Sequence, residues 1–241
     1  MRYSPAPMLD LSKIKAITLD LDDTLWPILP TIERCERLLH TWLQEQAPAT
    51  ALLLTDPHVR RELRETTAQQ WPDLAHDLAS LRREAIRLAL QRAGDAPALA
   101  EPAFAVFHAA RMQVDLFEDA RPGLASLAQR YPILALSNGS ADVHQVGIGE
   151  YFKGSVSARD AGVSKPDARI FQLAAQTLGV AVCDVLHVGD DAMMDVVGAL
   201  NAGMQTVWVN RADHLWSQPQ HPHATVASMT ELCDLLEVPA S

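Results

Sequence analysis

Apolar runs that predict buried strands occur near the start of the chain and again through its second half. A run of roughly four to eight apolar residues between polar or turn residues is typical of a strand buried in a parallel sheet. Helical spacing of apolar residues separates these runs, and strands that alternate with helices predict βαβ units and an α/β fold. The strand runs are residues 14–19, 133–136, 185–188 and 206–209, with a weaker strand around Val156. The helical patterns are residues 124–129, 168–178, 193–202 and 228–236.

Between residues 31 and 114 the pattern predicts helices only. Prolines and a glycine separate its helical segments, and Pro27 and Pro30 indicate a linker at its entrance. The sequence therefore predicts an all-helical domain of residues 27–116. It is inserted into a core domain of residues 1–26 and 117–241, whose residues 1–12 form a loose leader. The helical segments are residues 32–42, 59–67, 78–93 and 103–114.

Polar side chains follow three of the predicted strands. The carboxyl ends of parallel strands lie along one edge of a sheet, so these side chains are expected to converge there. Carboxylates so close together are unfavourable unless a cation or a proton shares the site. The alternative is an acidic turn after the first strand, with Thr24 starting a helix. The polar residues are Asp20, Asp22, Ser137, Asn138, Asp190 and Asp191.

Composition narrows the function. The net charge of −10 argues against general nucleic-acid binding, which needs a basic face, but not against a phosphorylated metabolite. The three cysteines have no metal-ligand or disulfide spacing, which indicates a reducing cytoplasm. The N-terminal residues do not resemble a signal peptide, and no segment is apolar enough to span a bilayer. We therefore expect a cytoplasmic protein without membrane or nucleic-acid partners.

The converging residue types suit phosphoryl transfer. Carboxylate oxygens are preferred ligands of Mg²⁺, which also binds substrate phosphate. Asp20, at the strand tip, is the best-placed nucleophile, and its attack on phosphorus gives an aspartyl-phosphate. Asp22 is close enough to protonate the leaving alcohol and then to deprotonate water. Ser137 and the amides after it are suited to hold phosphate oxygens, and Lys165 to neutralise the charge that builds up.

Four sequence segments in this order resemble the motifs of the haloacid dehalogenase-like (HAD) superfamily. Four ordered motifs are far more specific than any one of them. The resemblance spans roughly residues 14–211. The matching segments are Asp20-Leu21-Asp22-Asp23-Thr24 for the DxDxT motif, Ser137 for the second motif, Lys165 before Pro166-Asp167 for the lysine, and residues 189–195 for GDxxxxD.

The resemblance implies a Rossmann-like core with strand order 5-4-1-2-3 and a helical C1 cap that covers the site. It implies Asp20 as nucleophile and Asp22 as general acid/base. Mg²⁺ would be held by Asp20, the backbone carbonyl of Asp22 and Asp190, with Asp191 near its waters. Asp195 is expected to support Lys165 or the loop rather than to touch the metal. The residues predicted to bind substrate are Ser137, Asn138, Gly139, Thr24 and Trp26; Trp26 is a candidate for stacking on an aromatic substrate, or else packs the cap onto the core.

The predicted function is a Mg²⁺-dependent phosphatase acting on a small phosphorylated metabolite, as a monomer or homodimer. Residues 186–191 and 203–208 resemble a bacterial branch that dephosphorylates flavin mononucleotide or a riboflavin-pathway phosphate. Alternatives are a nucleotide or sugar-phosphate phosphatase, a 2-haloacid dehalogenase, and a phosphate-ligand binding protein without catalysis. The resemblance implies that true dehalogenases lack the acid found here at Asp22, which argues against the second alternative.

Overall fold

The computed structural model describes residues 8–237, so most of the predicted leader lies outside the described residues. By its internal contacts the chain forms two compact units. The core unit contains the residues up to Pro27, Leu116–Asn138 and the residues from Asp142 onwards. The helical unit contains Ile28–Asp115 together with Gly139–Ala141.

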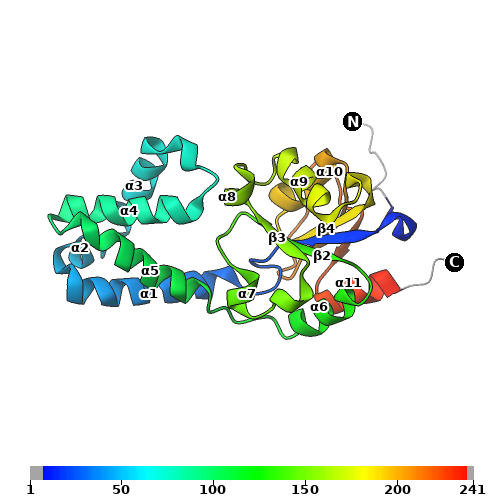
Figure 1. The fold of residues 1–241 in the computed structure, drawn as a ribbon, viewed down its shortest axis with the longest axis horizontal. Helices are drawn as coiled ribbons and strands as arrows, with labels where there is room; N and C mark the ends of the chain where they lie inside the picture. The colour runs from blue at the N-terminus through cyan, green and yellow to red at the C-terminus, as the bar shows by residue number, and fades with distance from the viewer. Residues whose placement is uncertain (1–7, 238–241) are drawn as a thin grey trace. The chain divides into compact units, whose positions relative to one another are not determined.

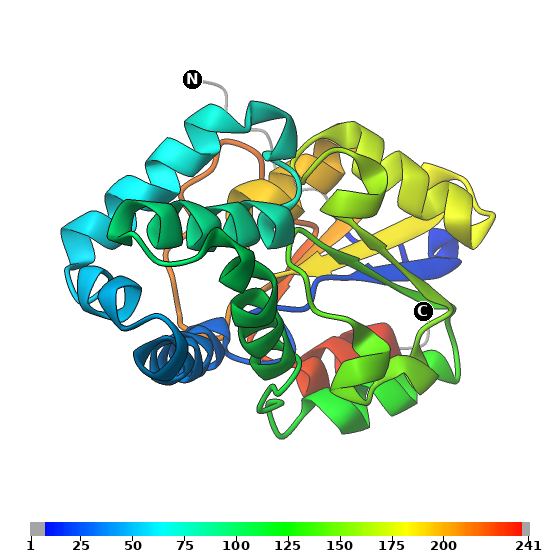
Figure 2. The same cartoon turned by 60° about the vertical axis from the view of Figure 1, so that its left-hand side comes forward.

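The core unit is built on a parallel sheet of six strands in the order β3-β2-β1-β4-β5-β6. Helices α6 and α11 cover one face of the sheet, and α9 and α10 cover the other (Figures 1 and 2). The predicted α/β fold and strand order are confirmed. The strands are β1 (Ala16–Leu19), β2 (Ile133–Ser137), β3 (Gly154–Ser157), β4 (Val185–Gly189), β5 (Gln205–Val209) and β6 (Ala224–Val226).

Strand β6 is an addition to the predicted sheet. It has three residues, too few to show a strand pattern, and it follows residues 210–223, which have no apolar run. The structure ties this segment to β5, because the Thr206 backbone N–H donates to His223 Nδ1 at 3.1 Å. Short edge strands of this kind are fixed by tertiary contacts that local sequence does not display.

Burial on both sides explains the apolar runs of the central strands. Every residue of β1, β2, β4 and β5 is buried, as expected for parallel strands covered by helices. Helix α9 covers the range that the sequence predicts, with Asp167 as its N-cap. The core helices are α6 (Ala120–Ala128), α7 (Val143–Val146), α8 (Ala158–Ala161), α9 (Ala168–Leu178), α10 (Gly198–Ala202) and α11 (Met229–Glu237), with short 3₁₀ turns at Leu11–Lys13, Gly149–Tyr151 and Val182–Asp184.

The helix predicted over residues 193–202 is wrong in its first half. A π-helical turn, η6 (Ala192–Val197), comes before α10. The Asp191 carboxylate accepts hydrogen bonds from the Met193 and Met194 backbone N–H groups at the start of this turn. The wider turn brings Asp195 back against Gly189, where a Cβ atom would lie 2.3 Å from Asp195 Cγ. Only glycine fits at that position of β4.

The helical unit has its own apolar core between α1, α2, α4 and α5. Helix α1 begins at Ile28, earlier than predicted, because Pro30 lies in its first turn, where no backbone N–H partner is lost. Helix α2 was not predicted. The helices are α1 (Ile28–Gln46), α2 (Pro48–Leu53), α3 (Pro57–Gln70), α4 (Leu78–Ala93) and α5 (Ala100–Arg111), with 3₁₀ turns at Pro72–Leu74 and Pro97–Leu99. Within residues 8–237, no helix has both the length and the apolar character that crossing a membrane requires.

Helix α2 is capped from outside its own segment. Its N-cap residue is Ala47, which has no side-chain acceptor for the first N–H groups of the helix. Asp95, which follows α4, takes this part: its Oδ2 accepts from the Thr50 backbone N–H and from Thr50 Oγ1, both at 2.7 Å. Thr50 is fully buried, so these groups would have no water to replace the carboxylate.

Asp95→Ala is expected to lower the free energy of unfolding by about 1–2 kcal/mol, because it leaves a buried N–H and hydroxyl without an acceptor. Urea unfolding followed by circular dichroism measures this. Asp73→Ala, at an exposed position, serves as the control. Equal stability of the two variants would show that the Asp95 cap contributes nothing.

Candidate active site

A tight turn after β1 sets the positions of the first acids. The Asp20 backbone N–H still donates to the Val188 carbonyl of β4, so Asp20 stands at the tip of the sheet. Asp23 then adopts a left-handed backbone conformation with φ of 56°, which aspartate tolerates better than most residues. A hydrogen bond closes the turn: the Asp23 backbone N–H donates to the Trp26 carbonyl at 2.7 Å. The Trp26 indole N–H donates to Asp22 Oδ1 at 2.8 Å, which orients that carboxylate.

Lys165 is the only cation in the described part of the chain that reaches Asp20. Its ammonium group is buried and donates to Asp20 Oδ1 at 2.5 Å, Asp195 Oδ1 at 2.6 Å and the Leu136 carbonyl at 3.0 Å. These acceptors match the three hydrogens of the ammonium group. Asn138 holds the lysine main chain, because its amide accepts from the Lys165 N–H at 2.8 Å and donates to the Lys165 carbonyl at 3.0 Å.

Asp195 is surrounded by donors. Besides Lys165, its carboxylate accepts from the Asp191 backbone N–H at 2.9 Å and lies 3.1 Å from His187 Nε2. The other ring nitrogen of His187 lies 2.9 Å from Thr18 Oγ1 of β1. Burial lowers the pKa of His187, so the neutral ring donates from Nε2 to Asp195 and accepts from Thr18 at Nδ1. The contact expected between Asp195 and Lys165 is present.

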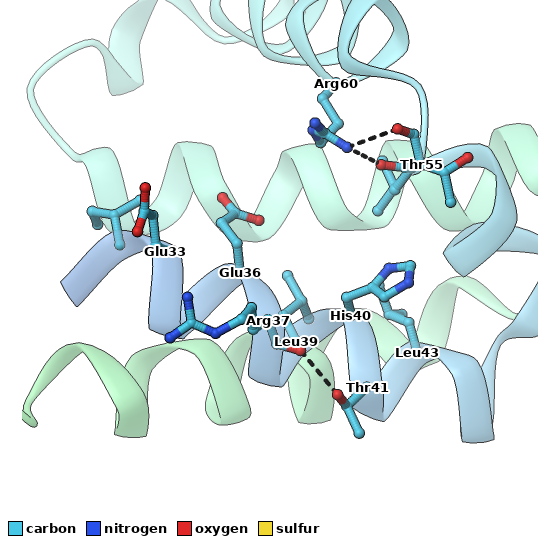
Figure 3. A pocket seen from close by; sticks show the side chains of 11 residues that line it. Glu33, Glu36, Arg37, Leu39, His40, Thr41, Leu43, Thr55 and Arg60 are labelled. Atoms are coloured by element: carbon cyan, nitrogen blue, oxygen red, sulfur yellow. Dashed lines mark hydrogen bonds between the residues drawn. The ribbon is translucent and has the colours of Figure 1, made fainter. Parts of the chain in front are cut away.

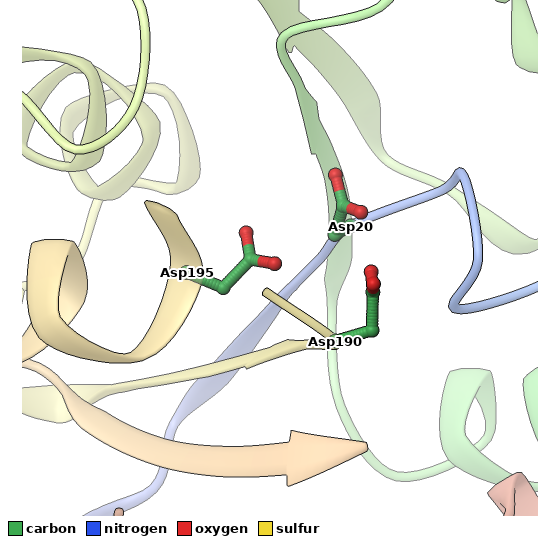
Figure 4. Close-up of side chains that lie close together, drawn as sticks. All are labelled: Asp20, Asp190 and Asp195. Carbon is green, nitrogen blue, oxygen red and sulfur yellow. The ribbon is translucent and has the colours of Figure 1, made fainter. Parts of the chain in front are cut away.

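Three carboxylates converge at the carboxyl edge of the sheet. One oxygen from each of Asp20, Asp190 and Asp195 lies within 4.8 Å of the other two (Figure 4). Asp190 is fixed on both sides, because its Oδ1 accepts from Thr24 Oγ1 at 3.1 Å and its backbone carbonyl from the Trp208 indole N–H at 2.6 Å. The cluster therefore joins two distant parts of the sequence, Asp20 after β1 and the segment of Asp190 and Asp195 after β4.

The charges in this cluster do not balance. Burial raises the pKa of Asp20 well above its usual range, although Lys165 opposes the shift. Burial and the charge of Asp195 raise the pKa of Asp190 to about 7. Burial acts in the same direction on Asp195, but Lys165 and His187 outweigh it and hold its pKa below the usual range. The charges of Asp195 and Asp20 likewise overcome the effect of burial on Lys165 and raise its pKa.

The donor set fits a divalent cation. Three carboxylates against one ammonium leave two negative charges when all are ionised. Mg²⁺ prefers oxygen ligands such as carboxylates, and its two positive charges would balance the two negative charges that remain. Asp20 and Asp190 are the fitting ligands, because Asp195 already accepts from Lys165 and the Asp191 N–H and contacts His187.

The other predicted site residues make different contacts. The carboxylates of Asp22 and Asp191 do not belong to it: Asp22 accepts from Trp26, and Asp191 caps η6. Ser137 is buried at the end of β2. The amide of Asn138 is engaged with Lys165, and Gly139 belongs by its contacts to the helical unit.

The prediction that Trp26 stacks on a substrate receives no support from the structure. Its ring is fully buried, and its one polar atom donates to Asp22. Two residues that support the cluster were missed: Trp208, which holds the Asp190 carbonyl, and Thr18, which contacts His187. Both lie within apolar strand runs, where a single polar atom gives no sequence signal.

A cavity of about 690 Å³ lies in the helical unit (Figure 3). Two of its charged side chains have partners within the unit: Arg60 donates to the Leu54 and Thr55 carbonyls, and Glu36 pairs with Arg82. No convergent carboxylate cluster was found among the described residues of this unit. The cavity therefore does not compete with the core cluster as the place of chemistry.

Comparisons with known proteins agree with this geometry. Residues 14–203 match the family model described as "Hydrolase: haloacid dehalogenase-like hydrolase". The chain is 33% identical over 234 residues to 5-amino-6-(5-phospho-D-ribitylamino)uracil phosphatase YigB of Escherichia coli K12, covering 94% of this chain and 98% of the relative. It is 33% identical over 150 residues to a phosphoserine phosphatase of Thermus thermophilus, covering 60% and 59%.

A solved structure is also similar over nearly the whole chain. A 2-haloacid dehalogenase from Pseudomonas syringae pv. Tomato DC3000 superposes with a TM-score of 0.88 at 34% identity, covering 94% of this chain and 100% of the other. The likeness therefore extends to proteins named for both phosphate ester and carbon–halogen hydrolysis.

Asp190→Asn is expected to stabilise the metal-free protein by about 1–3 kcal/mol at pH 8, because it removes a half-buried, poorly compensated charge while keeping an acceptor for Thr24. With a pKa of about 7, folded Asp190 keeps a proton that the unfolded chain releases near its usual value of 3.8. Stability of the original protein therefore falls as pH rises through this window. The gain is expected to grow from about pH 4 and to level off above about pH 7.

Urea unfolding in a chelator across this pH range tests the expectation. Asp234→Asn, at an exposed position, is the control and should change stability by less than about 0.5 kcal/mol. A loss of stability in Asp190→Asn at pH 8 would contradict the proposed charge imbalance.

Proposed function

The chain belongs to the haloacid dehalogenase-like hydrolases, and we propose that it is a phosphatase that hydrolyses a small phosphorylated metabolite with Mg²⁺ through an aspartyl-phosphate. The observation that carries this proposal is the Asp20 carboxylate, buried at the sheet edge against Lys165 in a cluster two positive charges short of neutral. A divalent cation and a phosphate group together suit such a site.

Asp20 is the proposed nucleophile. One of its oxygens attacks phosphorus, and the bond from phosphorus to the substrate alcohol breaks. Lys165 holds Asp20 Oδ1 at 2.5 Å and thereby fixes the direction of the carboxylate. Ser137, buried at the end of β2, is proposed to hold a phosphate oxygen, and Asn138 to position Lys165.

Asp22 is proposed to move the protons. It gives a proton to the leaving alkoxide, then takes one from the water that attacks the aspartyl-phosphate and releases inorganic phosphate and free Asp20. The bond from the Trp26 indole N–H keeps Asp22 in a fixed orientation within the same turn as the nucleophile.

Mg²⁺ would be held by the carboxylates of Asp20 and Asp190 and by the backbone carbonyl of Asp22. Bound there, the ion supplies positive charge to the phosphate oxygens and to the nucleophile. Asp191 is proposed to lie near its waters. We further infer that residues 27–116 form the cap domain, which selects the substrate.

The proposed substrate is a phosphate ester of the riboflavin pathway. The relative from Escherichia coli is named for 5-amino-6-(5-phospho-D-ribitylamino)uracil and matches this chain over almost its full length. Flavin mononucleotide shares the phosphorylated ribityl chain and is the second substrate to test. Sugar phosphates and nucleoside monophosphates are the remaining substrates to test, since other similar proteins are named as a glyceraldehyde 3-phosphate phosphatase and a pyrimidine 5'-nucleotidase.

Asp20→Asn is expected to lower kcat for p-nitrophenyl phosphate by at least about a thousandfold, because it removes the nucleophile while preserving shape. Asp22→Asn is expected to lower kcat by about 10²–10⁴-fold through loss of proton transfer. Phosphate release with and without Mg²⁺ is measured, with Asp234→Asn as control. Activity of Asp20→Asn equal to that of the original enzyme would refute the mechanism.

The second candidate is a 2-haloacid dehalogenase, which the similarity to the Pseudomonas syringae structure favours. There Asp20 would attack carbon and displace halide, with no need for a proton donor at Asp22. We expect no chloride release from 2-chloropropionate above background, measured by ion chromatography beside phosphate release from flavin mononucleotide. Metal-independent chloride release without phosphatase activity would reverse this assignment.

A further inference from the structure

Arg211, just beyond β5, makes three contacts around its guanidinium group. Its Nε donates to the Thr24 carbonyl at 3.0 Å, and one terminal nitrogen donates to Asp119 Oδ1 at 3.1 Å. The guanidinium also lies 4.0 Å from the centre of the Phe117 ring. The side chains of Arg211 and Asp119 are each 17% exposed, so this ion pair is largely shielded from water. No part of the predicted mechanism uses Arg211.

The partners of Arg211 are themselves fixed to the core unit. The second oxygen of Asp119 accepts from the Met229 backbone N–H at 2.7 Å and so caps the start of α11. The Phe117 backbone N–H donates to the Leu25 carbonyl at 2.9 Å. Arg211 therefore joins the turn after β1 to a rigid support made by α11 and residues 117–119.

The contact at Thr24 leads directly to the carboxylate cluster. Arg211 holds the Thr24 main chain, and the Thr24 hydroxyl donates to Asp190 Oδ1 at 3.1 Å. Thr24 is fully buried, so water does not replace either bond. Arg211 and Asp190 also line the same cavity of about 430 Å³, together with Asp23 and Phe117. The order of contacts is Asp119, Arg211, Thr24, Asp190.

We propose that Arg211 is a positioning residue of the cation site: it fixes the Thr24 main chain so that the Thr24 hydroxyl holds Asp190 in the orientation that binds Mg²⁺. The inference rests on the proposed function in taking Mg²⁺ as the cation. Residues that orient metal ligands commonly change metal affinity by about 10–100-fold when replaced. Arginine suits the position because its planar fork serves Thr24 and Asp119 at once, which lysine does not.

Arg211→Gln is expected to raise the Kd for Mg²⁺ by about tenfold, measured by calorimetric titration of the metal-free full-length protein. Arg211→Lys, which keeps a cation near Asp119 and Phe117, is expected to fall between this variant and the original. Arg130→Gln, at an exposed arginine, should leave the Kd unchanged. Circular dichroism and urea unfolding establish that each variant is folded, and Arg211→Lys supplies the measurement if Arg211→Gln does not fold.

A double-mutant cycle with Thr24→Val tests the route through Thr24. The valine keeps the backbone carbonyl that Arg211 binds but removes the hydroxyl that holds Asp190. If Arg211 acts through this hydroxyl, Arg211→Gln adds little to the Kd in the Thr24→Val background. Additive effects on the Kd would overturn the proposed route.

Kinetics separate positioning from direct substrate binding. The Mg²⁺ concentration that gives half-maximal hydrolysis of p-nitrophenyl phosphate should rise with the Kd, while KM for the ester at saturating Mg²⁺ changes little. An unchanged Kd, or a raised KM with an unchanged Kd, would overturn the inference. Absence of ester hydrolysis in the original protein, with Mg²⁺ binding that still depends on Arg211, would instead overturn the proposed function alone.

Discussion

Lys165 is the contact on which the site depends, because one buried ammonium group lies in a cluster of three carboxylates, of which Asp20 and Asp195 are buried and Asp190 is half-buried. Its three hydrogens go to Asp20, Asp195 and the Leu136 carbonyl. Breaking a buried ion pair on one side leaves an uncompensated charge that is strongly destabilising. The elements that position Lys165 and its partners, β1, β2 and the η6 turn, are therefore constrained together. Asn138 contributes by binding both polar groups of the Lys165 main chain.

The same constraint divides the aspartates into two kinds. The Asp195 carboxylate accepts hydrogen bonds from Lys165, the Asp191 N–H and His187, so its negative charge is well compensated and its role is structural. The carboxylates of Asp20 and Asp190 have fewer hydrogen-bond donors around them, and burial raises the pKa of both. Functional sites commonly retain such poorly compensated groups because a ligand completes them. Most hydrogen-bond donors of the site therefore surround Asp195, whereas Asp20 and Asp190, at the carboxyl edge of the sheet, lack enough positive charge to balance them.

The features that local sequence predicted are those with local causes. The apolar runs gave the central strands, because burial on both faces requires them, and α9 has a periodic face and the cap residue Asp167. Strand β6, the η6 turn and helix α2 depend on contacts distant in sequence, such as Asp95 on Thr50. In the site, the sequence indicated that Asp20, Lys165 and Asp190 converge. It gave no sign that Trp208 or Arg211 supports the cluster, since Trp208 lies within an apolar strand and Arg211 in the polar segment that follows it.

Similarity to phosphatases and to a dehalogenase has a common physical origin in this cluster. A carboxylate held by a buried lysine is a suitable nucleophile toward phosphorus and toward carbon alike. The difference lies in what surrounds it: a phosphate ester brings negative charge and a leaving group that needs a proton. Here Asp190 and Asp20 leave room for positive charge, and the Trp26 indole N–H keeps a second carboxylate, Asp22, in the nucleophile's own turn. A halide leaves without a proton, so a dehalogenase does not need Asp22 as a proton donor to the leaving group. For this reason the surroundings of Asp20, more than Asp20 itself, favour phosphate ester hydrolysis.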